Sequence, residues 1–309
     1  MILCLGTTPA VQRVMVFPKL ALDAVNRATT TLDGVAGKSI NVAKVLQALG
    51  ERPVAVGFLG GNRGEYLRAV LAERGLDHEF VTVRSRTRQC VTLIDQSAGT
   101  VTELVEESSG VDRSETEKLM NVVRHRLNGC RALVMSGTIA PGVSADFYLQ
   151  CARLAQEFRA LVVVDAQGAA LVETLKARPG LVKPNRLELA ATIGRELPEE
   201  KAVTQAMREL HERGAERIVV TAGMDPALAF DGRTFWRVAA PRVAAINPIG
   251  SGDAFAAGAV WRLLRGDDLG EACRWGCAAG AANALTALAG EVNRADVERL
   301  AREVILDRI

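Results

Sequence analysis

The chain has 309 residues, of which 49% are hydrophobic and 24% are charged. These proportions are typical of a globular protein with a substantial core and exclude disorder as the main state. The formal net charge is only +2, which gives no general electrostatic footprint for nucleic acid or an anionic membrane.

Strand-like and helix-like segments alternate along most of the chain, and this alternation predicts a largely parallel α/β sheet. The clearest strands are short apolar runs that suit burial on both faces, at residues 54–58, 132–135, 161–164 and 217–220. Helices are predicted at 39–49, 65–74, 202–213 and from 294 onward. The first three are each followed directly by a glycine, and Asn293 precedes the last.

Two regions, about 11–32 and 79–105, break this alternation. In the second region, residues 80–83, 90–94 and 100–104 look like successive antiparallel strands. We predict that the two regions form a small separate sheet that covers a site on the main body. Further on, residues 230–233 are typical of a hairpin turn between strands at 227–230 and 234–238.

The cellular setting is inferred from the cysteines and from the start of the chain. Six cysteines include no CxxC pair and are accompanied by only three histidines, so we expect buried free thiols rather than a zinc site. Residues 1–6 carry no basic leader, and no segment is apolar for long enough to span a bilayer. These features favour a reducing cytoplasm.

The segment Gly34–Ser39 admits three interpretations. It resembles the end of a P-loop, GxxxxGK[ST], but the first glycine of that pattern would fall at Leu32. It could instead be a glycine-rich start of a helix with a surface lysine. A third interpretation is a helix N-terminus that binds an anionic substrate.

The segment Asn247–Gly258 has closely spaced glycines that lead into a helix of small residues. Glycines allow successive backbone N–H groups to point inward, and a helix N-terminus adds partial positive charge. These features predict an anion hole for phosphate oxygens, with Asp253 at its edge to accept a hydroxyl proton. The alternative is close helix packing, with Asp253 as a cap.

The segment Lys183–Leu189 follows a strand-like run and combines a capping motif with oxygen-rich side chains. Pro184 disfavours helix at Lys183, so Asn185 is a plausible N-cap and Glu188 completes the capping-box spacing. The functional alternative places Asn185 and Glu188 near a magnesium–phosphate cluster, acting through water.

Together, these segments resemble the PfkB (ribokinase-like) family of carbohydrate kinases over nearly the whole chain. Gly250–Gly258 is similar to the family's second signature, GAGD followed by small residues, and Lys183–Leu189 to its KPNxxEL motif. Ala36–Ala43 resembles the first signature, GGKGxNVA, of the branch that acts on hexose phosphates, and Phe58–Gly64 resembles the FLGGxxG stretch.

The resemblance implies a three-layer α/β/α fold with a mostly parallel central sheet and a small β-sheet lid, within one kinase domain over 1–309. It implies that Asp253 is the catalytic base. Backbone N–H groups of Gly250, Ser251 and Gly252 would bind the transferring phosphoryl group. ATP and Mg²⁺ are the implied cofactors, with Mg²⁺ held by Asn185 and Glu188, and with further cofactor contacts from Lys183, Asn185, Thr221, Gly223 and Asn283.

For the substrate, the resemblance implies that the sugar is bound by Gly37, Lys38 and Asn41. Arg88, helped by Arg27, would bind a phosphate that the substrate already carries. This basic set suits a sugar phosphate, because its phosphate carries about two negative charges and arginine donates to phosphate in a fork.

Some positions depart from the family's pattern. Gln12 stands where an aspartate usually holds sugar hydroxyls, so the substrate contact there would be an uncharged amide. Pro226 replaces a glycine of the nucleotide turn, and Pro248 stands where threonine is usual before the anion hole. These changes bear on substrate and nucleotide choice more than on phosphoryl transfer.

We therefore expect ATP-dependent phosphorylation of a hydroxyl of a hexose phosphate, of the fructose 1-phosphate, tagatose 6-phosphate or fructose 6-phosphate class. Two alternatives are a kinase of an unphosphorylated sugar or nucleoside, and a non-catalytic sugar-phosphate sensor. The expected partner is a small-molecule sugar phosphate, with no nucleic acid and no membrane. Because such lids often pair between subunits in the family, a homodimer through the lid is also expected.

Overall fold

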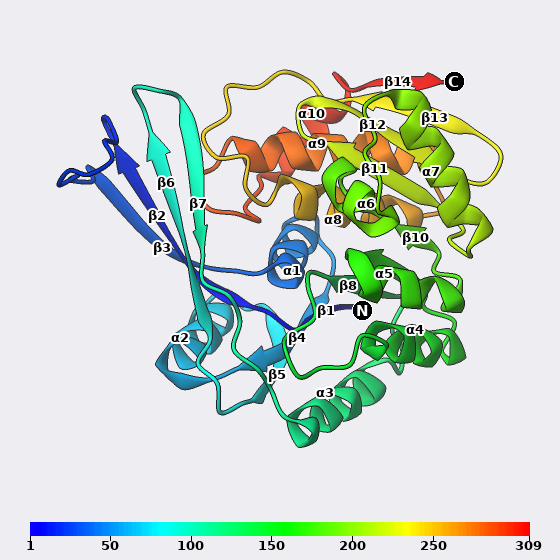
Figure 1. Ribbon diagram of the computed structural model, residues 1–309, viewed down its shortest axis with the longest axis horizontal. Coiled ribbons are helices and arrows are strands. Elements are labelled where there is room, and N and C mark those ends of the chain that lie inside the picture. Colours follow the sequence, from blue (N-terminus) through cyan, green and yellow to red (C-terminus); the bar gives the residue numbers. More distant parts are fainter.

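Two β-sheets organise the computed structural model, which describes residues 1–309 (Figure 1). The strands of the large sheet are β1 (Ile2–Gly6), β4 (Pro53–Leu59), β5 (Asp77–Thr82), β8 (Ala132–Ser136), β9 (Leu161–Asp165), β10 (Leu181–Val182), β11 (Ile218–Ala222), β12 (Asp225–Phe230), β13 (Phe235–Ala239) and β14 (Ile305–Arg308). Their order across the sheet is β14-β13-β12-β11-β10-β9-β8-β1-β4-β5. The strands from β11 to β5 in this order are parallel, and the three at the other edge pair in antiparallel fashion.

The central parallel strands are buried on both faces, as their uninterrupted apolar runs predict. Every residue of β1, β4 and β8 is buried. Along β1, Ile2 and Cys4 join one hydrophobic cluster while Leu3 and Leu5 join the other. The four predicted apolar runs lie in or overlap β4, β8, β9 and β11, so these predictions are confirmed.

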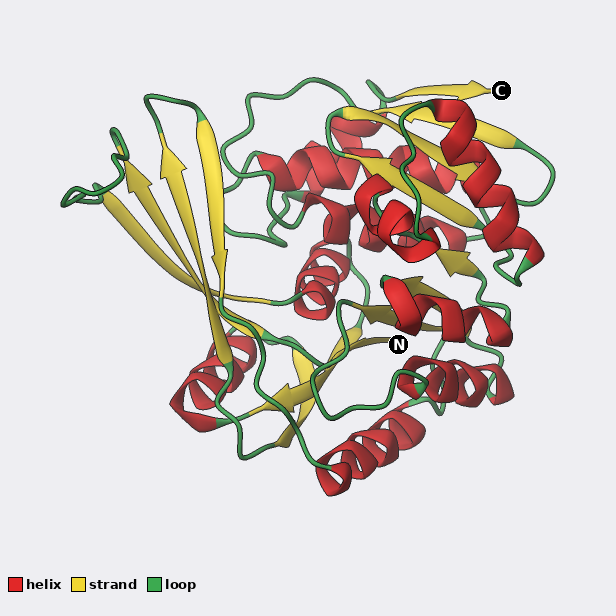
Figure 2. Cartoon of the chain, viewed as in Figure 1, coloured by secondary structure: helices red, strands yellow, loops and turns green.

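Helices cover both faces of the large sheet, so the three-layer α/β/α prediction is confirmed (Figure 2). One face carries α1 (Lys38–Ala48), α2 (Gly61–Glu73), α8 (Ser251–Leu263), α9 (Leu269–Ala284) and α10 (Arg294–Ala301). The other carries α3 (Arg113–Arg126), α4 (Phe147–Glu157), α5 (Gly168–Thr174), the short 3₁₀ helix η1 (Leu175–Ala177), α6 (Arg186–Ile193) and α7 (Glu200–Glu212). The predicted helix ends at Gly50, Gly75 and Gly214 hold to within two residues. The second helix, however, begins at Gly61 rather than near 65.

Helices α8 and α9 approach each other closely because both are rich in small residues. A Cβ atom at Gly258 would lie 2.6 Å from the carbonyl oxygen of Trp275. A Cβ atom at Gly276 would lie 2.9 Å from the carbonyl oxygen of Phe255. Because these contacts are with backbone atoms, neither glycine has room for a side chain, and the two helices are held in one relative position.

Four strands form a separate sheet, called the small sheet below, at the side of the molecule (Figure 1). They are β2 (Ala10–Phe17), β3 (Thr30–Ala36), β6 (Arg88–Asp95) and β7 (Thr100–Val105), in the order β3-β2-β6-β7. β2 pairs antiparallel with β3 and parallel with β6, and β6 and β7 form an antiparallel hairpin. A small separate sheet built from two distant parts of the chain is therefore present.

Its second part begins at Arg88 and not near residue 79, so the predicted boundary was wrong. The residues predicted as a first strand of that region, 80–83, belong largely to β5, which pairs parallel with β4 at the edge of the large sheet. Phe80 is buried in one hydrophobic cluster and Val81 in the other. Aromatic and β-branched residues in the sequence indicate a strand here, but only burial on both faces of the large sheet decides its partner.

The remaining local predictions agree with the structure. The hairpin of β12 and β13 turns at Asp231, whose Oδ1 accepts from the backbone N–H groups of Arg233 and Thr234. Asn293 caps α10 by accepting from the backbone N–H of Ala295. All six cysteines are buried free thiols. None of the helices combines the length and the apolar composition needed to cross a lipid bilayer.

Candidate active site

The candidate site gathers at the carboxyl ends of the parallel strands, where ligands of open α/β sheets usually bind. Asp165 is the last residue of β9, and Lys183 directly follows β10. Thr221 lies near the end of β11, where it forms a parallel bridge with Asn185. The N-termini of α1 and α8 meet this group of side chains from the helical layer.

The first turn of α8 is built around a glycine in the left-handed region. Gly250 caps this helix with φ of +86°, and a Cβ atom there would lie 2.9 Å from the Cβ of Ala289. The backbone N–H groups of Gly250, Ser251 and Gly252 therefore sit at the positive end of a long helix, where partial charge favours an anion. The Ser251 N–H already donates to Pro248 O at 3.1 Å, so the N–H groups of Gly250 and Gly252 are the free donors. Asp253 lies in the same turn and is buried.

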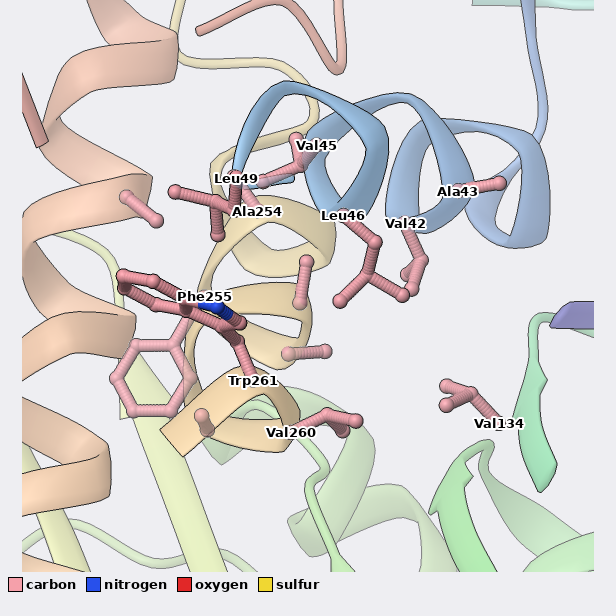
Figure 3. Close-up of a cluster of buried hydrophobic side chains, with 14 of the residues drawn as sticks. Val42, Ala43, Val45, Leu46, Leu49, Val134, Ala254, Phe255, Val260 and Trp261 are labelled. Atoms are coloured by element: carbon pink, nitrogen blue, oxygen red, sulfur yellow. The ribbon is translucent and has the colours of Figure 1, made fainter. Parts of the chain in front are cut away.

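Packing between α1 and α8 brings the first signature to the second. Figure 3 shows apolar side chains from α1 beside those of α8, among them Val42, Val45, Leu46, Ala254, Phe255 and Trp261. As a result Asn41 Nδ2 donates to Asp253 Oδ2 at 2.7 Å, across 212 residues of sequence. Asn41 Oδ1 is buried without a hydrogen-bond partner in the protein, so a polar acceptor is available beside Asp253.

The ionisation of Asp253 is tuned by its surroundings. Burial raises its pKa to about 6, against the partial opposing effects of the nearby Lys38 ammonium and the hydrogen bond from Asn41. A carboxyl group with this pKa is ionised at neutral pH and is still basic enough to take a proton from an alcohol in a transition state. The geometry and the pKa therefore both suit a general base.

Two lysines and two carboxylates alternate in a row of ion pairs within the site. Lys38 Nζ lies 2.8 Å from Glu188 Oε1 and 3.4 Å from Asp165 Oδ1. Lys183 Nζ lies 3.2 Å from Asp165 Oδ2. Lys183 Nζ also lies 3.7 Å from where a Cβ atom of Gly252 would stand, so its ammonium group adjoins the α8 N-terminus.

Asp165 was not among the predicted site residues. Burial acts to raise its pKa, but the ammonium groups of Lys183 and Lys38 overcome this effect and hold the pKa below its ordinary value. Burial likewise acts to lower the pKa of Lys38, and the surrounding carboxylates raise it above its ordinary value. The available signal was an apolar strand that ends in aspartate, a pattern too common to indicate a site by itself.

Asn185 and Glu188 form the capping box that their spacing predicts. Asn185 Oδ1 accepts from the backbone N–H of Glu188, and Glu188 Oε2 accepts from that of Asn185, each at 2.8 Å. The functional interpretation stays compatible with this cap, because Glu188 Oε1 faces Lys38 in the site. The side-chain atoms of Asn185 and Glu188 that could ligate a metal are oxygen atoms, which Mg²⁺ prefers. No three histidine, cysteine or acidic side chains lie close enough together to hold a metal, so an ion here would depend on water and phosphate oxygens.

Other predicted residues lie around this core in different ways. Gly37 caps α1 with φ of +113°, and a Cβ atom there would lie 2.8 Å from Pro9 Cα. Gly223, in the exposed turn after β11, has open space around it. Asn283 is fully buried behind the α8 loop, where its Nδ2 donates to Ile249 O at 2.9 Å. The structure thus uses the Asn283 amide to brace the loop.

Three predicted substrate residues belong to the small sheet, and only two of them are near the core of the site. Gln12 is buried, and its Oε1 accepts from the backbone N–H of Ala289 at 3.2 Å. Arg88 donates from Nε and Nη2 to Thr8 O at 3.1 and 3.0 Å. Arg27 is exposed in the loop between β2 and β3, at the far end of the small sheet, away from the other predicted residues (Figure 1).

The P-loop interpretation does not agree with the structure. Gly34 lies within strand β3, which continues to Ala36, so no phosphate-cradling loop precedes the lysine. Lys38 instead begins α1 and pairs with the two carboxylates described above. The segment is instead the start of a helix whose lysine side chain lies in the candidate site, and anion binding there stays a prediction.

The chain was compared with known families and solved structures. A model of the pfkB family carbohydrate kinases matches residues 1–295. Phosphofructokinase-2 from Escherichia coli, solved with potassium, is 29% identical, with 98% of each chain covered and a TM-score of 0.90. A Thermotoga maritima protein described as a possible 1-phosphofructokinase is 23% identical over 100% of this chain and 99% of its own, with a TM-score of 0.92. Arabidopsis thaliana ribokinase, solved with ribose and ATP, is 19% identical over 97% and 98%, with a TM-score of 0.75.

The last two likenesses show the ribokinase-like fold, and the family model covers nearly all of the chain. Three of the motifs, Ala36–Ala43, Lys183–Leu189 and Gly250–Gly258, are also brought together in space. The Lys38–Glu188 ion pair joins the first to the second, and the Asn41–Asp253 hydrogen bond joins the first to the third. The chain therefore belongs to the PfkB family of carbohydrate kinases, phosphotransferases that act on a hydroxyl group of a sugar.

Proposed function

We propose that the protein uses ATP and Mg²⁺ to phosphorylate a hydroxyl of a hexose phosphate, of the fructose 1-phosphate, tagatose 6-phosphate or fructose 6-phosphate class. The observation that carries this proposal is the buried Asp253 carboxylate in the first turn of α8, held by Asn41 beside the Gly250–Gly252 amides. One turn of helix thus supplies both a proton acceptor and donors for phosphate oxygens.

The reaction begins with the acceptor hydroxyl beside Asp253. As its oxygen attacks the γ-phosphorus of ATP, the Asp253 carboxylate takes the hydroxyl proton, and the bond from phosphorus to the β-phosphate oxygen breaks to leave ADP. The amides at the start of α8 and the Lys183 ammonium face the oxygens whose charge changes. Catalysis therefore comes mainly from placing the reactants and stabilising oxygen charge.

When bound, Mg²⁺ would neutralise part of the charge on the ATP phosphates and help to keep them in line. Asn185 and Glu188 would hold it through water, since their own oxygens already serve the α6 cap. Asp165 keeps Lys38 and Lys183 at fixed positions beside this cluster. The nucleotide would extend towards Thr221 and Gly223, with Asn283 acting through the loop that it braces.

A phosphate already on the sugar would be bound by Arg88, and Arg27, at the opposite end of the small sheet, would join it only from a second chain. In support, E. coli phosphofructokinase-2, 29% identical over 98% of each chain, has been solved with fructose-6-phosphate. Arg88 lies at the base of the small sheet, which we propose closes over the sugar as a lid and excludes water. Pairing of two such sheets in a homodimer would place the exposed Arg27 next to a second chain.

The assembly and the compartment are part of the same proposal. The E. coli enzyme has been solved in a tetrameric, inhibited form, so association is a property of one relative. Sedimentation of the purified protein should give a dimer, and a monomer at micromolar concentration would contradict pairing. Six buried free thiols suit the reducing cytoplasm in which we place the reaction.

The decisive experiment measures ADP release with fructose 1-phosphate, tagatose 6-phosphate, fructose 6-phosphate and the corresponding plain sugars. At least one sugar phosphate should have a kcat/KM well above that of every plain sugar. Arg88→Ala should raise the KM for that sugar phosphate about tenfold or more, as expected for losing a charged hydrogen bond. Arg86→Ala is the matched control, because Arg86 is exposed and pairs only with Glu106. Equal activity on plain sugars, or an unchanged KM in Arg88→Ala, would refute the proposed substrate class.

A further inference from the structure

The segment Ala287–Glu291, called the bridging loop below, lies between the small sheet and the start of α8. It follows α9 and contains the residues that touch Gly250. Its backbone hydrogen bonds run in two directions, towards the small sheet on one side and towards the phosphate-binding amides on the other.

On the side of the small sheet, two strands contact the bridging loop and a third strand contacts one of the residues that do so. Gln12 of β2 accepts from the backbone N–H of Ala289 at 3.2 Å and donates to Thr92 Oγ1 of β6 at 3.4 Å. Gly34 of β3, the register partner of Gln12, packs against the loop: a Cβ atom there would lie 3.1 Å from a methyl group of Leu288. The loop is therefore in direct contact with the sheet.

A buried lysine strengthens the same contact. Lys44 of α1 donates from Nζ to Val35 O of β3 at 3.0 Å and also to Ala289 O. The N–H and the carbonyl group of Ala289 are thus both engaged, one by Gln12 and the other by Lys44. Displacement of the small sheet would pull on this residue through both groups.

On the other side, the bridging loop touches the phosphate-binding amides. The backbone N–H of Gly290 donates to Asn283 Oδ1 at 2.7 Å, and Asn283 Nδ2 donates to Ile249 O and Ser251 Oγ. A Cβ atom at Gly250 would lie 3.0 Å from Gly290 N and 2.9 Å from Ala289 Cβ. Ala289 and Gly290 therefore pack directly against Gly250, so a shift of these two residues would disturb it.

We propose that Gln12 is a positioning residue that couples the small sheet to the phosphate-binding amides through the bridging loop, and that it does not bind the sugar. Both ends of its amide are already used, and the side chain is only 1% exposed. The inference rests on the proposed function, since its consequence is for phosphoryl transfer. Closure of the small sheet over the sugar would set the amides of residues 250–252 in their working positions.

The first test is kinetic and uses Gln12→Met, which keeps the length of the side chain but removes both hydrogen bonds. A misplacement of catalytic groups by about 1 Å can cost about 10²-fold in rate, so kcat should fall by about 10- to 100-fold. The KM for the sugar phosphate should stay within about twofold, because no contact with the sugar is lost. A rise in KM with kcat unchanged would show a sugar ligand and would overturn the proposal.

Thr92→Val removes only the hydroxyl on the small-sheet side and lies away from the phosphate-binding amides. It should lower kcat in the same direction, and the double variant with Gln12→Met should be no worse than Gln12→Met alone. Thr102→Val is the matched control, since Thr102 is exposed on the neighbouring strand β7 and has no such contact. Additive losses, or an equal loss in Thr102→Val, would overturn the coupling. If Gln12→Met fails to fold, Thr92→Val carries this test.

A second test does not depend on turnover. Amide hydrogen exchange should become about tenfold faster at Ala289 in Gln12→Met, as expected when one hydrogen bond is lost. The coupling further requires faster exchange at residues 249–253, and exchange confined to the bridging loop would overturn it. If no sugar phosphate is turned over by the unchanged protein, the proposed function fails, while this exchange experiment still decides whether the coupling exists.

Discussion

Replacing Asp253 by asparagine should remove activity and at the same time make the folded protein more stable. The carboxyl group has a pKa of about 6 in the folded chain, against an ordinary value of 3.8. Between these two values the folded state holds the proton more tightly than the unfolded state. The free energy of unfolding therefore falls as the pH rises through this window, and the full cost is present above pH 6.

The size of this cost follows from the shift. About 2.2 pKa units at 1.36 kcal/mol each give about 3 kcal/mol as an upper limit for keeping Asp253 ionised in the folded chain. Asparagine has nearly the same shape and carries no charge, and its side-chain oxygen can still accept from Asn41 Nδ2. We expect Asp253→Asn to gain about 1–3 kcal/mol at pH 7.5 and almost nothing near pH 4.

The assay is urea unfolding of the wild type and the variant at pH 4.5, 6 and 7.5, with turnover measured on the same preparations. Loss of the proposed general base should lower kcat by about 10²- to 10⁴-fold. Asp165→Asn is the matched control: this carboxylate is also buried, but two lysines hold its pKa below its ordinary value. Its removal leaves the buried Lys183 ammonium group without an ion pair, so that variant should be less stable at pH 7.5.

Two results would refute this reasoning. One is an Asp253→Asn protein that is less stable than the wild type at pH 7.5, because the ionised carboxylate would then not lower the free energy of unfolding. The other is near-normal turnover in a folded Asp253→Asn protein, because the proton would then go elsewhere. A gain in stability that is the same at every pH would point to packing rather than to charge.

Three further predictions concern neighbouring groups. The kcat/KM should fall about tenfold per pH unit below pH 6, where Asp253 becomes protonated. Lys38→Met should move this fall to higher pH, because the Lys38 ammonium lowers the pKa of Asp253. If the fall in kcat/KM stays at the same pH in Lys38→Met, the group that titrates is on the substrate and not Asp253. Gly250→Ala should reduce kcat and lower the melting temperature more than Gly168→Ala does. Both residues have positive φ, but only Gly250 lacks space for a methyl group. Equal losses of melting temperature in the two variants would show that backbone strain alone is responsible. Glu188→Gln should raise the Mg²⁺ concentration needed for half-maximal rate about tenfold, and an unchanged requirement would remove Glu188 from the metal environment.

The helical and strand elements, and the residues of the main motifs, could be predicted from the sequence because each leaves a local signal. The glycine in the left-handed region at Gly250 and the cap at Asn185 are fixed by neighbours within a few residues. The meeting of Asn41 with Asp253, by contrast, depends on the packing of α1 against α8. It could be expected only because the order of the motifs resembles that of a family.

Other features could not be predicted because they depend on partners distant in the sequence. β5 carries the aromatic and β-branched residues typical of a strand, but its pairing with β4 is decided by two buried faces. Asp165 ends an ordinary apolar strand, and its role is visible only with Lys38 and Lys183 on either side. Gln12 was predicted from its motif position to meet the substrate, whereas the structure shows its amide occupied by protein partners.

The glycine contacts between α8 and α9 limit how this enzyme could be adapted to another sugar. Gly258 and Gly276 have backbone atoms of the opposite helix where a side chain would be, so a redesign cannot reshape the reaction centre by tilting α8. Strands β3 and β7 of the small sheet, by contrast, carry several exposed positions, and Figure 1 shows this sheet joined to the body at the lower ends of its strands. Libraries that seek new acceptors should therefore vary the small sheet and leave this helix pair untouched.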